Sequence, residues 1–261
     1  MAWTAAVDSS QGPRHRALGA PCQDFGRLAK PSNDVLVGAL ADGAGGAAFS
    51  HLGAQAAVSA ALDLLEARLA EDSGLRGDPA GGPGGADALF DGVLDAAREA
   101  LARQAESVGQ PVDAFATTLL VFAAGPRGVA AFQVGDGWLV GRTAEGVYRL
   151  LSRPQRGEYA NETVFVTSPD AEDAATVTHS TGPAGFLCAS TDGLTAVSIE
   201  NRAEAPHAPF FQPLDRFMAE TADDAEAHHA IRSFLRSERL QARVEDDVTL
   251  LLGGWRPLGR A

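Results

Sequence analysis

One segment near the start of the chain restricts the fold more than any other. Residues 35–41 form an uninterrupted apolar run, VLVGALA, which ends abruptly at Asp42 and is followed by the glycine-rich stretch 43–46. A short apolar run that is bounded by turn residues is typical of a β-strand. The sequence therefore predicts a strand that delivers a carboxylate to a glycine loop.

The other predicted elements are grouped by type along the chain. Apolar residues at helical spacing predict helices over 49–71 and 89–101, which we expect to pair, and a helical region over about 214–239. Short β-type runs predict strands at 3–7, 115–122, 129–134, 138–142, 147–151, 176–179, 185–190 and 248–255. The four strands between 115 and 151 are so closely spaced that they suggest a meander. Helices grouped between runs of antiparallel strands predict an α+β layered domain, a β-sandwich flanked by helices.

The length of the chain predicts one large core. With 261 residues the chain can bury such a core without disulfides, and we expect a single domain over 1–261. Residues 72–86 are rich in glycine and proline, but they lie between two helices that we expect to pack together. They therefore do not mark a domain boundary.

The net charge and the cysteines narrow the class of protein. A formal net charge of −13 argues against nucleic acid or an anionic membrane as a partner, and it favours bound divalent cations. Cys22 and Cys188 are too few for a disulfide framework and fit no metal-ligand spacing. Because the N-terminal segment does not resemble a signal peptide, we expect a cytoplasmic protein with reduced thiols.

Aspartates recur where predicted strands begin or end. These are Asp24, Asp42, Asp136, Asp192 and Asp246. Three of them precede glycine, which lets an ion or a substrate approach the backbone closely. Taken singly, an Asp-Gly pair is also the common signature of a turn. Taken together, these carboxylates fit a hard divalent cation, whose oxygen ligands must converge from different elements.

Six short motifs occur in order along the chain. They are Gln23-Asp24, Ala41-Asp42-Gly43-Ala44-Gly45-Gly46, Ala116-Thr117-Thr118-Leu119, Val134-Gly135-Asp136, Ser190-Thr191-Asp192-Gly193 and Asp246-Asp247-Val248-Thr249. This ordered set resembles the metal-dependent protein serine/threonine phosphatase family, type 2C, and residues 19–24 and 157–163 resemble its bacterial branch more particularly. The resemblance implies a four-layer α-β-β-α sandwich of two mainly antiparallel sheets flanked by paired helices. It also implies a binuclear Mg²⁺ or Mn²⁺ centre in a cleft at one end.

The resemblance further implies a catalytic role for the matched residues. Asp42 would bridge both metal ions, the Gly43 carbonyl would contact one of them, and Asp192 with Asp246 would hold the other. Two cations that share a water lower its pKa and direct it at phosphorus, so no covalent phosphoenzyme is needed.

Other matched residues would support this centre. Asp24 would orient the bound waters, and Asp136 would help to hold a third and weaker ion. The alternative for Asp136 is a tight hairpin turn. Gln23 stands where many relatives have Glu and keeps an oxygen that can accept from a bound water. Thr117 and Thr118 would be supporting residues at the head of a strand.

The sequence departs from the family pattern at two positions. Animal members carry a histidine as a candidate general acid where this chain has Ala44, and a metal-bound water or His15 could supply the proton instead. The phosphate-binding arginine of those members is replaced by Gly19, for which Arg14 and Arg16 are the nearby substitutes, and Arg16 is the one we select. The alternatives are an exposed loop histidine for His15 and a solvated surface charge for Arg16.

These observations predict a phosphoserine/phosphothreonine phosphatase that acts as a monomer and opposes a partner Ser/Thr kinase. In the region 152–173, Tyr159, Asn161 and Glu162 are candidates for selecting the phosphoprotein. Two alternatives stay open at this point. One is a catalytically weak module with the same fold that binds a kinase or phosphoprotein, and the other is a phosphomonoesterase for small molecules.

Overall fold

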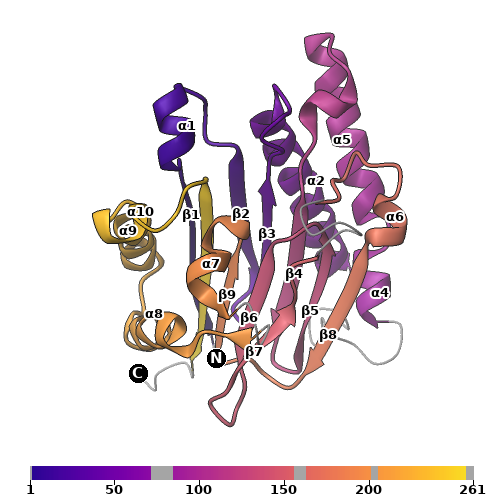
Figure 1. Cartoon of the computed structure of the whole chain (residues 1–261). Coiled ribbons are helices and arrows are strands. Elements are labelled where there is room, and N and C mark those ends of the chain that lie inside the picture. Colours follow the sequence, from indigo (N-terminus) through magenta and orange to yellow (C-terminus); the bar gives the residue numbers. More distant parts are fainter. Residues whose placement is uncertain (1, 72–84, 156–162, 201–204, 257–261) are drawn as a thin grey trace.

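Two antiparallel sheets lie face to face, with helices over both outer faces (Figure 1). The computed structural model describes residues 2–71, 85–155, 163–200 and 205–256. In the first sheet the strand order is β1 (Ala2–Ser10), β12 (Val248–Arg256), β9 (Phe186–Ser190), β6 (Trp138–Arg142) and β7 (Tyr148–Ser152). In the second sheet the order is β2 (Asp24–Ser32), β3 (Val35–Asp42), β4 (Leu119–Gly125), β5 (Gly128–Val134) and β8 (Thr176–Thr181). The short strands β10 (Ile199–Glu200) and β11 (Ala205–Pro206) pair with each other.

The helices cover the outer faces in groups. The second sheet is covered by α2 (Ser50–Glu71), α4 (Gly85–Phe90) and α5 (Val93–Val108), and the first by α8 (Ala208–Glu220), α9 (Asp224–Leu235) and α10 (Glu238–Gln241). The connections contain α1 (Pro13–Leu18), α6 (Ala171–Ala174), α7 (Thr195–Ser198) and the 3-10 turns Val112–Phe115 and Asp192–Leu194. The predicted α-β-β-α sandwich with paired helices on each outer face is confirmed.

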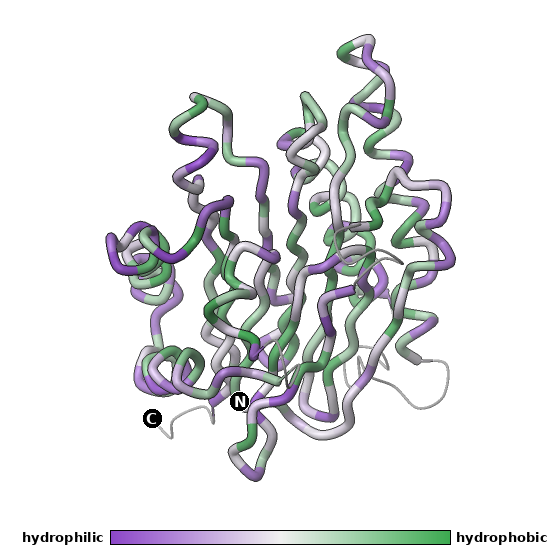
Figure 2. The backbone as a smooth tube through the Cα atoms, viewed as in Figure 1, coloured by the Kyte–Doolittle hydropathy of each residue, from purple (hydrophilic) through white to green (hydrophobic). Residues whose placement is uncertain are grey.

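Alternation along the strands divides the hydrophobic core into three layers. In β3, Val37 and Ala39 pack against the helices over the second sheet, whereas Leu36 and Leu40 pack between the two sheets. Both faces of the strand are therefore covered, so the sequence shows an unbroken apolar run instead of polar alternation. Hydrophobic residues accordingly follow the central strands in Figure 2.

The predicted meander is wrong. Strands β4 and β5 form a hairpin, as do β6 and β7, but β5 pairs on its other side with β8, and β6 pairs with β9. The turn-like stretch 135–137 therefore carries the chain from one sheet to the other, and Gly135 adopts a φ of 106° there. This three-residue break has the local sequence of a hairpin turn, because the choice of strand partner depends on the rest of the fold.

Among the elements that the sequence interpretation missed, two matter for the functional site, β2 and α1. Strand β2 has a polar composition, DFGRLAKPS, because it forms one edge of the second sheet. Helix α1 has six residues with Pro13 in its first turn, and its length is too short for helical periodicity to be visible. Both elements turn out to carry residues of the functional site.

None of the helices in the described part of the chain combines the length and the apolar character that a membrane crossing requires.

The layer between the sheets generates a stability prediction. The Phe122 side chain is fully buried there, so Phe122→Ala should lower the free energy of unfolding by about 3–5 kcal/mol, as measured in urea. The control is Leu18→Ala, because Leu18 is 72% exposed and its change should stay within about 0.5 kcal/mol. Equal effects of the two substitutions would contradict the assignment of Phe122 to the core.

Candidate metal centre

Three aspartates from different elements converge at one end of the sandwich. Asp42 ends β3 in the second sheet, Asp192 follows β9 in the first sheet, and Asp136 lies in the connection between the sheets. One carboxylate oxygen from each lies within 4.8 Å of the others, and all three residues are partly exposed. The alternative of a hairpin turn at Asp136 is wrong, since its segment joins two sheets. The cluster offers a cation several oxygen ligands that can be reached from solvent.

The backbone at Asp42 is held by the two threonines that open the next strand. Thr117 Oγ1 donates to the Asp42 carbonyl at 2.9 Å, and the Asp42 amide donates to Thr118 Oγ1 at 2.9 Å. The Thr118 amide donates to the same carbonyl at 2.8 Å. Thr117 and Thr118 thus fix the main chain from which the Asp42 carboxylate projects, which is what residues that support a site would do.

Two glycines next to the aspartates permit close approach of the backbone. A Cβ at Gly43 would lie 2.7 Å from the Cβ of Ser50, and a Cβ at Gly193 would lie 2.1 Å from the Asp247 carbonyl oxygen. The contact at Gly193 brings the segment after β9 against the segment before β12. Asp192 and Asp246 consequently lie near each other, and the Asp246 charge contributes to raising the pKa of Asp192.

Asp24 lies beside this cluster but is held differently. It is directly opposite Asp42 in the β2–β3 pair and is 5% exposed. Thr191 Oγ1 donates to its Oδ2 at 2.6 Å, and the same hydroxyl accepts the Thr249 amide at 3.0 Å. Asp24 is therefore fixed behind Asp42 by residues of the first sheet, a position that suits a group supporting the ligands.

Burial and mutual repulsion oppose ionisation of these carboxylates. Burial is the main cause that raises the pKa of Asp24 to about 7 and the pKa of Asp192 to about 6. Burial, together with the charges of Asp24 and Asp192, raises the pKa of Asp42 well above its usual range. The pKa of Asp136 is also raised by burial. A bound cation would remove the cause of these shifts by compensating the negative charge.

In the described part of the chain, two buried oxygens at this site lack hydrogen-bond partners. Thr163 donates to Asp136 Oδ2 at 2.7 Å, but Asp136 Oδ1 accepts no hydrogen bond within the described residues, and neither does Gln23 Oε1. A buried oxygen without a partner is costly unless an ion or a water satisfies it. The oxygens present therefore fit a hard divalent cation with its bound waters.

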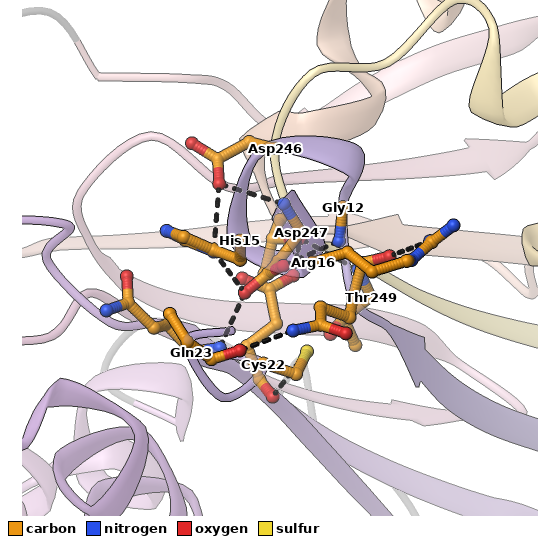
Figure 3. Close-up of polar contacts among 12 residues, drawn as sticks. Gly12, His15, Arg16, Cys22, Gln23, Asp246, Asp247 and Thr249 are labelled. Atoms are coloured by element: carbon orange, nitrogen blue, oxygen red, sulfur yellow. Dashed lines mark hydrogen bonds and ion pairs between the residues drawn. The ribbon is translucent and has the colours of Figure 1, made fainter. Parts of the chain in front are cut away.

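One carboxylate next to this cluster, that of Asp247, already has all its hydrogen bonds within the protein. Asp247 is 2% exposed and accepts from the Gly12 amide at 2.7 Å, the Gln23 amide at 2.6 Å and His15 Nδ1 at 2.9 Å (Figure 3). These bonds join α1, the start of β2 and the start of β12. We conclude that Asp247 is a structural residue. The sequence interpretation missed it, because the Asp246-Asp247 pair does not show which carboxylate is buried.

The two candidates for binding the substrate phosphate, His15 and Arg16, differ in their burial and in their contacts. His15 is 6% exposed, so the alternative of an exposed loop histidine is wrong, and its Nδ1 also lies 3.6 Å from Asp246 Oδ1. Arg16 is on the surface, and its Nη2 donates to the Gln11 carbonyl and to Gln241 Oε1. The guanidinium is thus engaged away from the three aspartates, and a phosphate contact would require it to leave these partners.

Gly19 has no side chain that could bind phosphate in place of the arginine. It ends α1, where it adopts a left-handed φ of 64°. Tyr159, Asn161 and Glu162, the candidates for partner selection, lie outside the described residues.

Comparisons with known proteins agree with this geometry. A family model described as Protein phosphatase 2C matches residues 11–236. Serine/threonine-protein phosphatase 3 of Escherichia coli K12 is 30% identical over 98% of this chain and 99% of its own length. Among solved structures, serine/threonine phosphatase Stp1 from Staphylococcus aureus is 14% identical with a TM-score of 0.64, covering 98% of this chain and 96% of that chain. The catalytic domain of PstP, solved with 2 manganese ions, is 19% identical with a TM-score of 0.54, covering 97% and 98%.

The raised pKa values predict how the stability of the metal-free protein depends on pH. Asp24 and Asp192 bind protons more tightly when folded than in the unfolded chain, where their pKa is about 4. Stability in EDTA should therefore fall as the pH rises from about 4 to about 7. Melting temperatures between pH 5 and 8 test this, and Asp192→Asn should make the decline shallower. A melting temperature that rises with pH over this range would contradict the charge arrangement.

Proposed function

Since the chain belongs to the protein phosphatase 2C family, we propose that it is a metal-dependent phosphatase that removes phosphate from phosphoserine and phosphothreonine in proteins. The similarity to the E. coli enzyme covers nearly the whole of both chains. That relative is named a serine/threonine-protein phosphatase, and its substrate class is the best available guide to the substrate of this chain.

One observation carries this proposal. Asp42, Asp136 and Asp192 bring carboxylate oxygens within 4.8 Å of one another, although they come from both sheets and from the connection between them. Carboxylates repel one another unless a cation lies between them. A module that only bound a partner through its surface would not need such an arrangement.

The proposed division of ligands among the ions follows the family pattern, and the convergence of Asp42, Asp136 and Asp192 supports it. We assign Asp42 and the Gly43 carbonyl to the first ion, and Asp192 with Asp246 and a share of Asp42 to the second. Asp136, one of whose oxygens has no partner among the described residues, would hold a third. We propose Mg²⁺ or Mn²⁺ as the ions, in keeping with the oxygen donors and with the manganese in the PstP structure. When bound, such ions activate water and neutralise the oxygens of a phosphoryl group.

The residues around the ligands would orient the reactants. Asp24 lies opposite Asp42, and Thr191 holds its Oδ2, so its carboxylate is fixed beside the cluster. Gln23 Oε1 is buried and has no partner within the described residues, so it can accept from a water at the site. The backbone amide of Gln23 donates a hydrogen bond to Asp247, and this bond fixes the residue in place. These two residues are therefore proposed to position the attacking water.

The leaving group needs a proton, and Ala44 cannot supply one. His15 is the residue proposed to do so, because its Nδ1 bonds to Asp247 and this contact fixes the ring. The other ring nitrogen, Nε2, is then the atom that can transfer a proton. The arrangement of an imidazole oriented by a buried carboxylate is common among general acids and bases.

Neither cysteine is suited to attack phosphorus. Burial and the nearby carboxylates of Asp24 and Asp247 raise the pKa of the Cys22 thiol, which disfavours the nucleophilic thiolate. Cys188 is fully buried in the core beneath the helices of the first sheet. A cysteine-based phosphatase mechanism is therefore disfavoured.

The domain organisation, oligomeric state, location and partners of the protein are also proposals. We propose a single domain that acts as a monomer in the cytoplasm, reversing the action of a partner Ser/Thr kinase and binding neither nucleic acid nor membrane. The net charge of −13 supports the last point, because it disfavours polyanionic surfaces.

The proposed activity predicts a dependence on metal. Hydrolysis of p-nitrophenyl phosphate should vanish in EDTA and return with Mn²⁺ or Mg²⁺, because the water nucleophile depends on the ions. Phosphothreonine peptides should be hydrolysed with higher kcat/KM than small phosphorylated metabolites. Full activity in chelator would refute the mechanism, whereas a preference for metabolites would support a small-molecule phosphomonoesterase.

The assignment of Asp192 and Asp246 predicts a thermal shift. Mn²⁺ should raise the melting temperature of the wild-type protein, because a ligand that binds only the folded state stabilises it. Asp192→Ala and Asp246→Ala should each abolish most of that shift. The matched control is Asp63→Ala, since Asp63 is on the surface and pairs with Arg27, and it should keep the full shift. If all three variants respond to Mn²⁺ as the wild type does, the site is misplaced.

A further inference from the structure

A large groove lies on the outer face of the first sheet, away from the three converging aspartates. Its volume is about 870 Å³, and it lies among α7, β10, α8 and the end of α9 with α10. Its floor is apolar and includes Val197, Phe210, Leu214, Phe234 and Leu240. Phe210 and Phe234 contact each other with ring centroids 6.2 Å apart, which gives the floor an aromatic centre. Such a surface favours an apolar occupant.

Two arginines form one rim of this groove. Arg239 and Arg243 line it, both are exposed, and within the described residues neither guanidinium has an ion-pair partner. Among the described lining residues Glu200 is the one carboxylate, and His207 Nδ1 lies 3.1 Å from it. The chain as a whole carries a net charge of −13. The rim is thus locally positive in a chain that is acidic as a whole, so it can attract an anionic partner.

The exposure of the lining residues indicates what kind of molecule the groove accepts. Of the residues that line it, only Ile199 and Leu240 are buried, whereas Ala196, Pro209 and Pro213 are exposed. A small-molecule site encloses most of its ligand, so an open trough between helices suits a segment of a protein better. Apolar troughs between helices commonly accept an amphipathic helix whose apolar side chains face the floor.

The groove is also close to the proposed metal ligands along the chain. Ala196 and Val197 follow Asp192 by four and five residues, and Arg243 precedes Asp246 by three residues. A protein held in the groove would thus contact chain segments that lead directly to both aspartates.

We propose that this groove docks an acidic, amphipathic segment of a partner protein, whose apolar side chains fill the floor and whose carboxylates pair with Arg239 and Arg243. The interaction is one of binding and does not depend on phosphatase activity.

Direct binding tests this proposal. The probe is a fluorescein-labelled peptide of about twelve residues, with Leu and Phe at helical spacing and Glu on the flanks. A twin peptide carries Lys in place of Glu. Fluorescence anisotropy should show saturable binding of the Glu peptide to the wild-type protein. The double variant R239E/R243E should bind it at least about tenfold more weakly and should gain affinity for the Lys peptide.

The control is the double variant R216E/R236E, which changes two exposed arginines of the same helical layer that do not line the groove. It changes the net charge by the same amount, so its affinity for the Glu peptide should stay within about twofold of wild type. Melting temperatures show whether each variant is folded. Equal weakening in both double variants would overturn the proposal, because the attraction would then be unspecific. Saturable binding of dodecanoate without binding of the Glu peptide would also overturn it and assign the groove to small amphiphiles.

Discussion

Repulsion among carboxylates of like charge is the constraint on which the rest of this structure depends. Asp42, Asp136 and Asp192 bring oxygens within 4.8 Å of one another, and burial opposes ionisation further. Such an arrangement persists only if the backbones that carry the side chains cannot move apart. The apolar layer between the two sheets supplies that rigidity, because it joins the strands that carry Asp42 and Asp192 into one core.

Two kinds of carboxylate therefore lie side by side at this end of the sandwich. Asp247 accepts from two backbone amides and a histidine, so its hydrogen-bonding capacity is used within the protein. Asp136 keeps one buried oxygen without a partner in the described chain. The saturated group holds the framework together, whereas the unsatisfied one is available to an ion. This difference separates a structural aspartate from a proposed ligand more reliably than its burial does.

Each feature that the sequence interpretation predicted wrongly or missed has a physical explanation. The break at 135–137 has the residues of a tight turn, yet it changes sheets, since β6 finds a better partner in β9 than in β5. Strand β2 carries Arg27 and Lys30, which an edge strand tolerates because one of its sides remains accessible to water. His15 has the local sequence of an exposed loop, but a bond to Asp247, 232 residues away, holds it in the interior.

The sequence by itself determined the layered α+β class and the aspartates that end its strands, because apolar runs and the residues that terminate them are local properties. The family resemblance also pointed to Thr117 and Thr118, which bond to the main chain of Asp42 in the structure. Only the tertiary structure decided which strands share a sheet and that Asp136 lies beside Asp42 and Asp192. It also decided that the Asp247 carboxylate accepts hydrogen bonds from within the protein. These outcomes depend on contacts between segments far apart in the chain, and the free energy of such contacts is not contained in any local pattern.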